Sequence, residues 1–422
     1  MTTHEFSTGA PDSDSQERVG LLFTVVYALG YFGLWMALLT PVVVTMALRI
    51  AEIDPANKES TLALILGIGA FVALVANPVA GYFSDRTTSR FGMRRPWIVG
   101  GVLVGTFGLY LVATGGFAII LVGWVLAQLG FNAALAAIVA ILPDQVPVSQ
   151  RGTVSGVLGI CLQLGVVAGV FVTERAGGNV VSMFLWPSYV CIALVLLLAV
   201  FLNDRRLDPS DVTPADLGAF AKSFWISPSK APDFAWAFLS RFLLFIGLAT
   251  LLTYQVYFLI DRLGVAPADI PGKMLTSTIV TTIATVLGSL TGGWMSDRLE
   301  GRRKLFVWLA AAIYASGLIV VAMSTTFGMF LVGLAVCGVG QGVYFAVDLA
   351  LVTEVLPNKD DAAKDLGIFN IASAMPQSIA PAIAPIFLAI GGAGNNYGAL
   401  YTAAGIFAAL GALAIFPIRG VK

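Results

Sequence analysis

Nine stretches of this sequence run for 19 to 53 residues without a single Asp, Glu, Lys or Arg. A helix needs about 20 apolar residues to cross a hydrocarbon core roughly 30 Å thick, because each residue rises ~1.5 Å. Every backbone polar group must be satisfied inside such a core, so spanning segments without strand alternation are helices. The uncharged stretches therefore predict an α-helical membrane protein.

Three of the nine stretches, 96–143, 305–347 and 366–418, are long enough for two spans each. We expect their breaks at Gly115-Gly116, at Ser324 to Gly328 and at Gly391 to Asn396, because glycine and short polar runs favour turns. The total is then twelve spans. Only 11% of residues are charged, against about a quarter in soluble domains, which excludes an ordinary soluble enzyme.

The sequence lacks the features that are typical of several other classes of function. The net charge is zero, so nothing indicates a nucleic-acid partner. Cys161, Cys191 and Cys337 fall inside apolar stretches without metal-ligand spacing. The only histidine, His4, lies in the polar N-terminal segment, and no nucleophile–base arrangement is visible. We expect no cofactor, no metal and no enzymatic activity.

The basic residues predict the orientation. With the N-terminus inside, 18 of the 24 Lys and Arg residues fall on the cytoplasmic side and five outside, which follows the positive-inside rule. We expect a multi-pass protein of the cytoplasmic membrane with both termini in the cytoplasm. The expected organisation is a tail (1–19), a six-helix half (20–203), a linker (204–233), a second six-helix half (234–418) and a tail (419–422).

The two halves repeat a sequence signal. Gly81-Tyr-Phe-Ser-Asp85-Arg86 follows span two, and Gly293-Trp-Met-Ser-Asp297-Arg298 follows span eight, each with basic residues just beyond. Asp144-Gln-Val-Pro147 after span four corresponds to Glu354-Val-Leu-Pro357 after span ten. Many secondary transporters consist of two such halves with the substrate site between them.

This G-x-x-x-D-R…R-R signal resembles the major facilitator superfamily, and the loop 84–97 resembles its glycoside–pentoside–hexuronide and sucrose–proton symporters. The resemblance implies a major facilitator fold of two six-helix pseudo-repeats, alternating access and a monomer. It also implies a gating latch at the cytoplasmic face, unless these arginines only set topology. The latch residues would be Asp85, Arg86, Arg90, Arg94, Arg95, Asp297, Arg298 and Arg302.

Two ionisable residues lie deep inside spans, where charges are costly and default to functional hypotheses. Arg241 in span seven and Asp348 in span ten lie roughly 12 and 13 Å from the same membrane face. We expect them to form an ion pair sensitive to protons or substrate. The alternatives are a static buried pair, or Arg241 reaching Glu354.

Polar and aromatic residues share helical faces at spacings of three or four. Rings cover the apolar face of a pyranose and amides bind its hydroxyls, so these faces favour sugar recognition; hydrogen bonding between helices is the alternative. The resemblance places spans one, four, seven and ten around the central cavity. The candidate substrate-binding residues are Tyr31, Trp35, Gln128, Asn132, Gln163, Arg241, Gln255, Gln341, Tyr344, Asn370 and Gln377.

Sodium-coupled members of the resembled group carry acidic residues within spans two and four. Here neither span has one before Asp85 and Asp144, so we expect the proton as coupling ion, carried by Asp348 beside Arg241, and not sodium. The function expected is proton-coupled symport of a sugar or glycoside, with a small solute and the lipid bilayer as partners. The alternatives are an exporter or facilitator of a metabolite or drug, and a lysolipid-type carrier.

Overall fold

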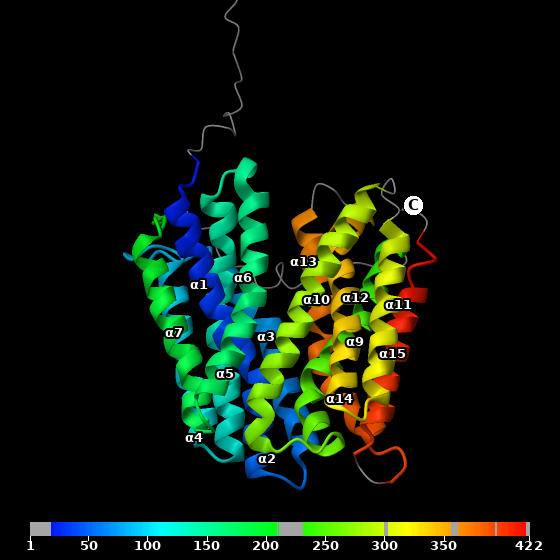
Figure 1. Ribbon diagram of the computed structural model, residues 1–422. Helices are drawn as coiled ribbons and strands as arrows, with labels where there is room; N and C mark the ends of the chain where they lie inside the picture. The colour runs from blue at the N-terminus through cyan, green and yellow to red at the C-terminus, as the bar shows by residue number, and fades with distance from the viewer. Residues whose placement is uncertain are drawn as a thin grey trace, which may run out of the picture.

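The computed structural model describes residues 18–208, 210, 231–298, 303–355, 362–392 and 395–418, and no strand occurs among them. Figure 1 shows two helical bundles standing side by side, one from each half of the chain. The linker expected at 204–233 lies mostly outside the described residues, as do the tails before residue 18 and after residue 418.

The first bundle contains six spans that alternate in direction. The first span is continuous through three segments, and the other five are single helices. Their bounds are α1 (Leu21–Thr40) with η1 (Pro41–Thr45) and α2 (Met46–Ile53), α3 (Lys58–Ser84), α4 (Arg95–Thr114), α5 (Phe117–Gln145), α6 (Val148–Arg175) and α7 (Val180–Phe201).

The second bundle repeats this arrangement, with its fifth span divided into two helices. Its elements are α9 (Pro232–Tyr257) with η3 (Phe258–Arg262), η4 (Pro267–Asp269) leading into α10 (Ile270–Arg298), α11 (Arg303–Met323), α12 (Phe327–Val355), α13 (Ala362–Ala374), α14 (Pro376–Leu388) and α15 (Tyr397–Leu413).

The described helices confirm the prediction of twelve spans. Eleven are long and apolar enough to cross a membrane, and Tyr397–Leu413 is a shorter apolar helix. The breaks between Thr114 and Phe117, between Met323 and Phe327, and between Leu388 and Tyr397 fall where the sequence predicted them.

Prolines explain the irregular helices. Pro41 has no N–H for the carbonyl four residues back, and the helix widens there into the π-helical turn Pro41–Thr45. Pro385 leaves the carbonyl of Pro381 without its helical donor in the same way, and the Tyr254 hydroxyl of α9 donates to that carbonyl at 3.3 Å. This hydrogen bond joins the irregular backbone of α14 to the neighbouring helix α9.

Glycines allow α4 and α5 to approach closely. A Cβ atom at Gly108 would lie 2.5 Å from the carbonyl oxygen of Gly123, and one at Gly130 would lie 2.5 Å from the carbonyl oxygen of Gly101. Contacts this close leave no room for a side chain, and small residues favour helix association inside lipid because backbones can then touch.

The two bundles meet near one face of the molecule. We name the face that carries residues 18, 85–94 and 418 the tail face, and the face that carries the turns 54–57, 263–266 and 389–392 the loop face. In Figure 1 the bundles converge at the loop face and their ribbons diverge toward the tail face. At the loop face the Tyr257 hydroxyl donates across the interface to the carbonyl of Ala47 at 3.0 Å.

Candidate functional site

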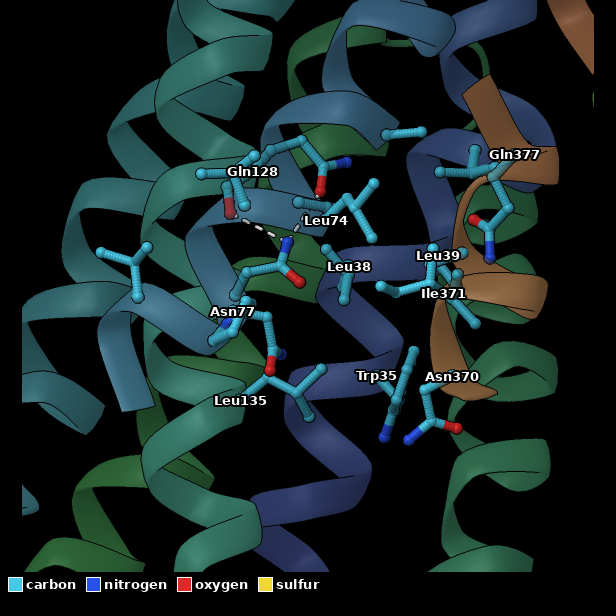
Figure 2. Close-up of a pocket in the computed structure, with 18 residues that line it drawn as sticks. Trp35, Leu38, Leu39, Leu74, Asn77, Gln128, Leu135, Asn370, Ile371 and Gln377 are labelled. Carbon is cyan, nitrogen blue, oxygen red and sulfur yellow. Dashed lines mark hydrogen bonds between the residues drawn. The ribbon is translucent and has the colours of Figure 1, made fainter. Parts of the chain in front are cut away.

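A cavity of about 850 Å³ lies between the two bundles. Spans one, two and four form one wall, and α13 and α14 form the other (Figure 2). None of the eighteen lining residues is charged. The polar and aromatic lining residues are Trp35, Asn77, Gln128, Asn132, Asn370 and Gln377.

Gln128 and Asn132 lie one turn apart on α5 and orient each other. The Asn132 amide nitrogen donates to both the side-chain and the backbone oxygen of Gln128, each at 2.9 Å. These bonds occupy the amide nitrogen of Asn132 and the amide oxygen of Gln128. The amide oxygen of Asn132 and the amide nitrogen of Gln128 are not used in them. The Gln128 amide N–H groups and the Asn132 carbonyl oxygen can therefore bind a solute.

Asn77 and Pro78 on α3 also line the cavity, and neither was predicted from the sequence. Pro78 cannot donate to the carbonyl of Leu74, which lies four residues earlier and also lines the cavity. The helix therefore leaves an acceptor near the amide of Asn77. An Asn-Pro dipeptide in the middle of an apolar span was the signal that could have located this part of the site.

The opposite wall comes from the divided fifth span of the second half. Asn370 on α13 and Gln377 on α14 flank the break at Met375, and both side chains line the cavity. In Figure 2 the Trp35 ring from α1 lies beside Asn370. The cavity therefore presents amides from both halves and one large ring.

A second cavity, of about 60 Å³, continues from the first and shares Ala70, Gln128 and Gln377 with it. Trp124 of α5 and Thr253 of α9 line this smaller space. The Trp124 indole N–H is buried and has no hydrogen-bond partner. The indole nitrogen lies against Gly69 of α3, where a Cβ atom would be 2.0 Å from it, so a glycine is needed beside this ring.

Five of the predicted substrate-binding residues line the large cavity, and they come from spans one, four and eleven. Tyr31 lines neither cavity, and its ring lies edge-on to that of Trp35 at a centroid distance of 6.0 Å. The other five candidates, which include Arg241 of the charged pair, also line neither cavity. The large cavity is lined by spans one, two, four and eleven, where the resemblance implied one, four, seven and ten. Besides Tyr31, the candidates outside both cavities are Gln163, Gln255, Gln341, Tyr344 and Arg241.

Arg241 and Asp348 form the expected ion pair, with Nη1 and Oδ2 2.6 Å apart. Their side chains are only 14% and 10% exposed. The guanidinium also lies over the rings of Phe245 and Phe369, at 5.3 and 4.7 Å from their centroids. Neither charged residue lines the large or the small cavity, so the charged pair and the solute cavity are separate.

At the tail face, Arg94 is the centre of the loop between spans two and three. Its guanidinium contacts Asp85 at 2.6 Å and Asp144 at 2.9 Å, and donates to the Ser84 hydroxyl at 3.0 Å. Of the arginines close to Asp85 in the sequence, Arg86, Arg90 and Arg94, it is Arg94 that forms the ion pair with Asp85. All these contacts lie within the first half.

Asp204, which was not predicted as a site residue from the sequence, caps the N-terminus of α4. Its carboxylate accepts from the backbone N–H groups of Arg94 at 2.9 Å and Arg95 at 2.8 Å. An anion is favourable at this end of the helix dipole. Gly92 has φ of 103°, and a Cβ there would overlap Asp204. The N-terminal amides of α4 are therefore bound by Asp204, and Asp85 pairs instead with the Arg94 side chain.

The remaining basic residues of this loop contact rings and carbonyls. Arg86 donates to the Tyr82 carbonyl at 3.0 Å and lies 3.6 Å from its ring centroid. Arg90 lies over Phe91, and Arg95 donates to the Leu202 carbonyl at the end of span six.

The second copy of the signal is described only in part. Arg298 lies over Trp294 at 4.1 Å, and Arg302 and the side chain of Asp297 lie outside the described residues. Lys304, at the start of α11, donates to the carbonyls of Phe416 and Ile418. In the first half, Arg95 donates to the end of span six in the corresponding way.

A family model matches almost the whole chain, and individual proteins match short parts of it. The model of the Major Facilitator Superfamily matches residues 20–281 and 274–421. The general alpha-glucoside permease of Schizosaccharomyces pombe is 34% identical over 101 residues, which are 23% of this chain and 17% of that protein. An uncharacterized symporter of Synechocystis is 32% identical over 100 residues, 24% of this chain and 18% of that protein. The chain thus matches less than a fifth of the length of these relatives.

Solved structures share the fold over nearly the whole chain. A peptide transporter in complex with alafosfalin has a TM-score of 0.76 at 16% identity, covering 96% of each chain. A nucleoside transporter has a TM-score of 0.72 at 14% identity, covering 94% of this chain and 99% of that one. A bacterial homologue of the human lysosomal transporter Spinster, inward-facing and unoccupied, has a TM-score of 0.68 at 15% identity, covering 97% and 98%.

These likenesses establish the fold, and the family is one of transporters and not of enzymes. With twelve spans, an uncharged cavity between two halves and a family model that matches almost its entire length, this chain belongs to the major facilitator superfamily.

Proposed function

We propose that this protein transports a neutral, hydroxyl-rich solute, a sugar or glycoside, by alternating access with proton symport. The observation that carries the proposal is the cavity between the halves, whose lining has five amide side chains, one tryptophan and no charge. A charged solute would leave its charge uncompensated in such a site, which is costly in a medium of low polarity.

Several of the lining groups can each bind one part of a sugar. Gln128 offers N–H donors and Asn132 offers a carbonyl acceptor, and the Leu74 carbonyl lacks its helical donor. Trp35 supplies a flat apolar surface for the face of a pyranose ring. The volume of about 850 Å³ lies within the range of 300–1,000 Å³ usual for small-molecule sites.

We assign the tail face to the cytoplasm, because most basic residues lie in segments on that side. The bundles converge at the loop face, so the state described here is inward-facing in this orientation. The protein then works in the cytoplasmic membrane, and we expect a monomer because each half supplies one wall of the cavity.

Proton coupling is assigned to Asp348 and Arg241. Protonation of Asp348 would remove its charge and release Arg241 from the 2.6 Å contact. Because α9 and α12 carry these two residues, loss of the pair would change how the two helices pack. The charge change would therefore alter the second half without any contact to the solute.

The test is to reconstitute the purified protein in liposomes and record transient currents on a supported membrane, with a panel of mono- and disaccharides and with and without sodium. We expect a sodium-independent inward current that Gln128→Leu weakens. Gln163→Leu, an amide outside both cavities, is the matched control and should retain the current. Asp348→Asn should abolish it.

Silence across the panel, in protein shown to be folded, would contradict electrogenic sugar symport for the sugars tested. A current that survives Asp348→Asn would remove Asp348 from coupling and leave symport intact.

A second candidate is a neutral amphipathic solute, such as a drug or a lipid with one acyl chain. Most of the lining is apolar, including Leu38, Leu39, Leu74 and Ile371. Competition in the same assay separates the two candidates, because an amphipathic substrate would suppress the sugar current or give a signal where every sugar is silent.

A further inference from the structure

The small cavity of about 60 Å³ is lined by span seven, which contributes no described residue to the large cavity. Both spaces include Gln128 and Gln377 in their walls, so the small cavity is continuous with the solute site. In Figure 2 these two amides lie toward one end of the large cavity, and Trp35 and Asn370 lie toward the other. The small cavity therefore extends the solute site beyond Gln128 and Gln377.

This extension points toward the loop face. The helix α5 begins at that face with Phe117, and Trp124, which lines the small cavity and not the large one, comes one turn before Gln128. On span seven, Thr253 comes one turn before Tyr257, whose hydroxyl joins the two halves at the loop face. A part of the solute that entered the small cavity would therefore lie between the halves, at the closed end of the site.

Three polar side chains of the small cavity have hydrogen-bonding groups that the described part of the chain does not use. Thr253 is 5% exposed, and its hydroxyl has no partner among the described residues. Thr250, three residues earlier, instead donates to the Ile246 carbonyl of its own helix at 2.8 Å. The amide nitrogen of Gln128 and the amide of Gln377 are likewise unused within the described ranges. Spans four, seven and eleven thus each bring one of these groups to the same small space.

The volume limits what this space can hold. A cavity that holds one water has a volume of about 10–15 Å³. A space of about 60 Å³ therefore takes a substituent of a few non-hydrogen atoms and is too small for a second sugar ring. The apolar side chains of Val42, Ala249 and Leu252 form much of the remaining wall. A short group with an apolar stem and a polar end fits these dimensions.

The lining groups also limit the chemistry of that polar end. None of the residues that line the small cavity is charged, so a carboxylate, a phosphate or an ammonium would have no compensating charge there. The Gln128 nitrogen donates, and the Thr253 hydroxyl both donates and accepts. A hydroxyl group can satisfy both, because it donates one hydrogen bond and accepts others. A methyl group in the same place would leave both side chains without a partner once water is displaced.

We propose that the small cavity is a subsite for the hydroxymethyl group of the transported sugar, with Thr253 as the residue that determines this specificity. The inference rests on the proposed function and adds which part of the sugar points toward the loop face. The methylene contacts Ala249 and Leu252, and the hydroxyl lies among the polar groups of Gln128, Thr253 and Gln377. The ring stays in the large cavity. Because Gln128 belongs to the first half and the other two to the second, the bound hydroxyl links the halves.

The test compares sugars that differ only at this group, by transient currents in proteoliposomes of the full-length protein. The probes are the methyl glycosides of glucose, 6-deoxyglucose and xylose, which carry a hydroxymethyl group, a methyl group and a hydrogen at the same position. The galactose, 6-deoxygalactose and arabinose series is the second set. We expect kcat/KM for the hydroxymethyl sugar to exceed that of the other two by about 10- to 100-fold, because the analogues leave buried polar groups unpaired.

Three variants distinguish a contact of the Thr253 hydroxyl from a general effect on span seven. Thr253→Val keeps the shape of the side chain and removes the hydroxyl, so the preference for the hydroxymethyl sugar over the xyloside should fall by about fivefold or more. Its kcat/KM for the xyloside should stay within about twofold of the wild type. Thr253→Ser should retain the preference. Thr250→Val is the matched control, because Thr250 bonds its own helix and lines neither cavity, and it should also retain the preference.

Equal kcat/KM values for the hydroxymethyl sugar and its analogues in the wild type would overturn the subsite and leave sugar symport intact. A Thr253→Val protein that keeps the wild-type preference would do the same, as would one that loses all three sugars equally. A loss of preference in Thr250→Val as large as in Thr253→Val would assign the effect to the packing of α9 and contradict the contact. Silence with every sugar would contradict the proposed function itself, and with it a hydroxymethyl group as the occupant.

Discussion

Arg241 and Asp348 are 107 residues apart in the sequence, yet their side chains form a 2.6 Å contact inside the second half. Removing one member of such a pair leaves a buried charge without compensation, which costs about 3–5 kcal/mol. We therefore expect Asp348→Asn and Arg241→Gln each to lower the thermal stability of the detergent-solubilised protein. The double variant should recover most of the loss, as measured by size-exclusion chromatography after heating. If the double variant is less stable than either single one, the pair is not the dominant interaction of these side chains.

Asn132 orients Gln128 and presents its own oxygen to the cavity. Asn132→Leu removes both contributions, and we expect the KM for the transported solute to rise roughly 5- to 30-fold, which corresponds to about 1–2 kcal/mol. Initial uptake rates in proteoliposomes measure this change. Asn203→Ala, at the tail face, is the control with unchanged KM. An equal loss in both variants would mean that Asn132 does not contact the solute.

Arg94 contacts two carboxylates and a hydroxyl with one planar group. A lysine has a single ammonium and cannot reproduce this geometry. We expect Arg94→Lys to lower the free energy of unfolding by about 1–2 kcal/mol, a moderate value because Asp85 and Asp144 are partly exposed. Arg90→Lys, which changes a residue that lies over Phe91, should have almost no effect on the melting curve. Equal melting temperatures for the two variants would contradict the central position of Arg94.

Gly92 combines a φ of 103° with direct contact to Asp204. Gly92→Ala should therefore displace Asp204 from the N-terminus of α4 and cost more than about 1 kcal/mol. Gly100→Ala, within α4 and with open space at its Cβ position, should be neutral or slightly stabilising. Thermal melts of the two variants test this difference, and a stable Gly92→Ala protein would show that the cap is dispensable.

The repeated signals at Asp85 and Asp297 were visible in the sequence, but the sequence did not show which partner each charged residue contacts. Several arginines lay within reach of Asp85, and only folding brought Asp144 and Asp204 to the same place. Asp204 follows span six, more than a hundred residues from the amides that it caps. Local sequence pattern carries no information about a contact of this range.

The sequence by itself determined the twelve helices and their breaks, because the length of an uncharged stretch and the cost of bare backbone in lipid are local properties. It also indicated two intramembrane charges at equal depth, which the structure pairs. What only the tertiary structure decided was the membership of the cavity. Gln128 and Gln341 are both amides inside spans, but only Gln128 lines a space between the halves. Which face of each span meets that space depends on how the bundles are tilted and where proline divides a helix, and these are properties of the packed molecule.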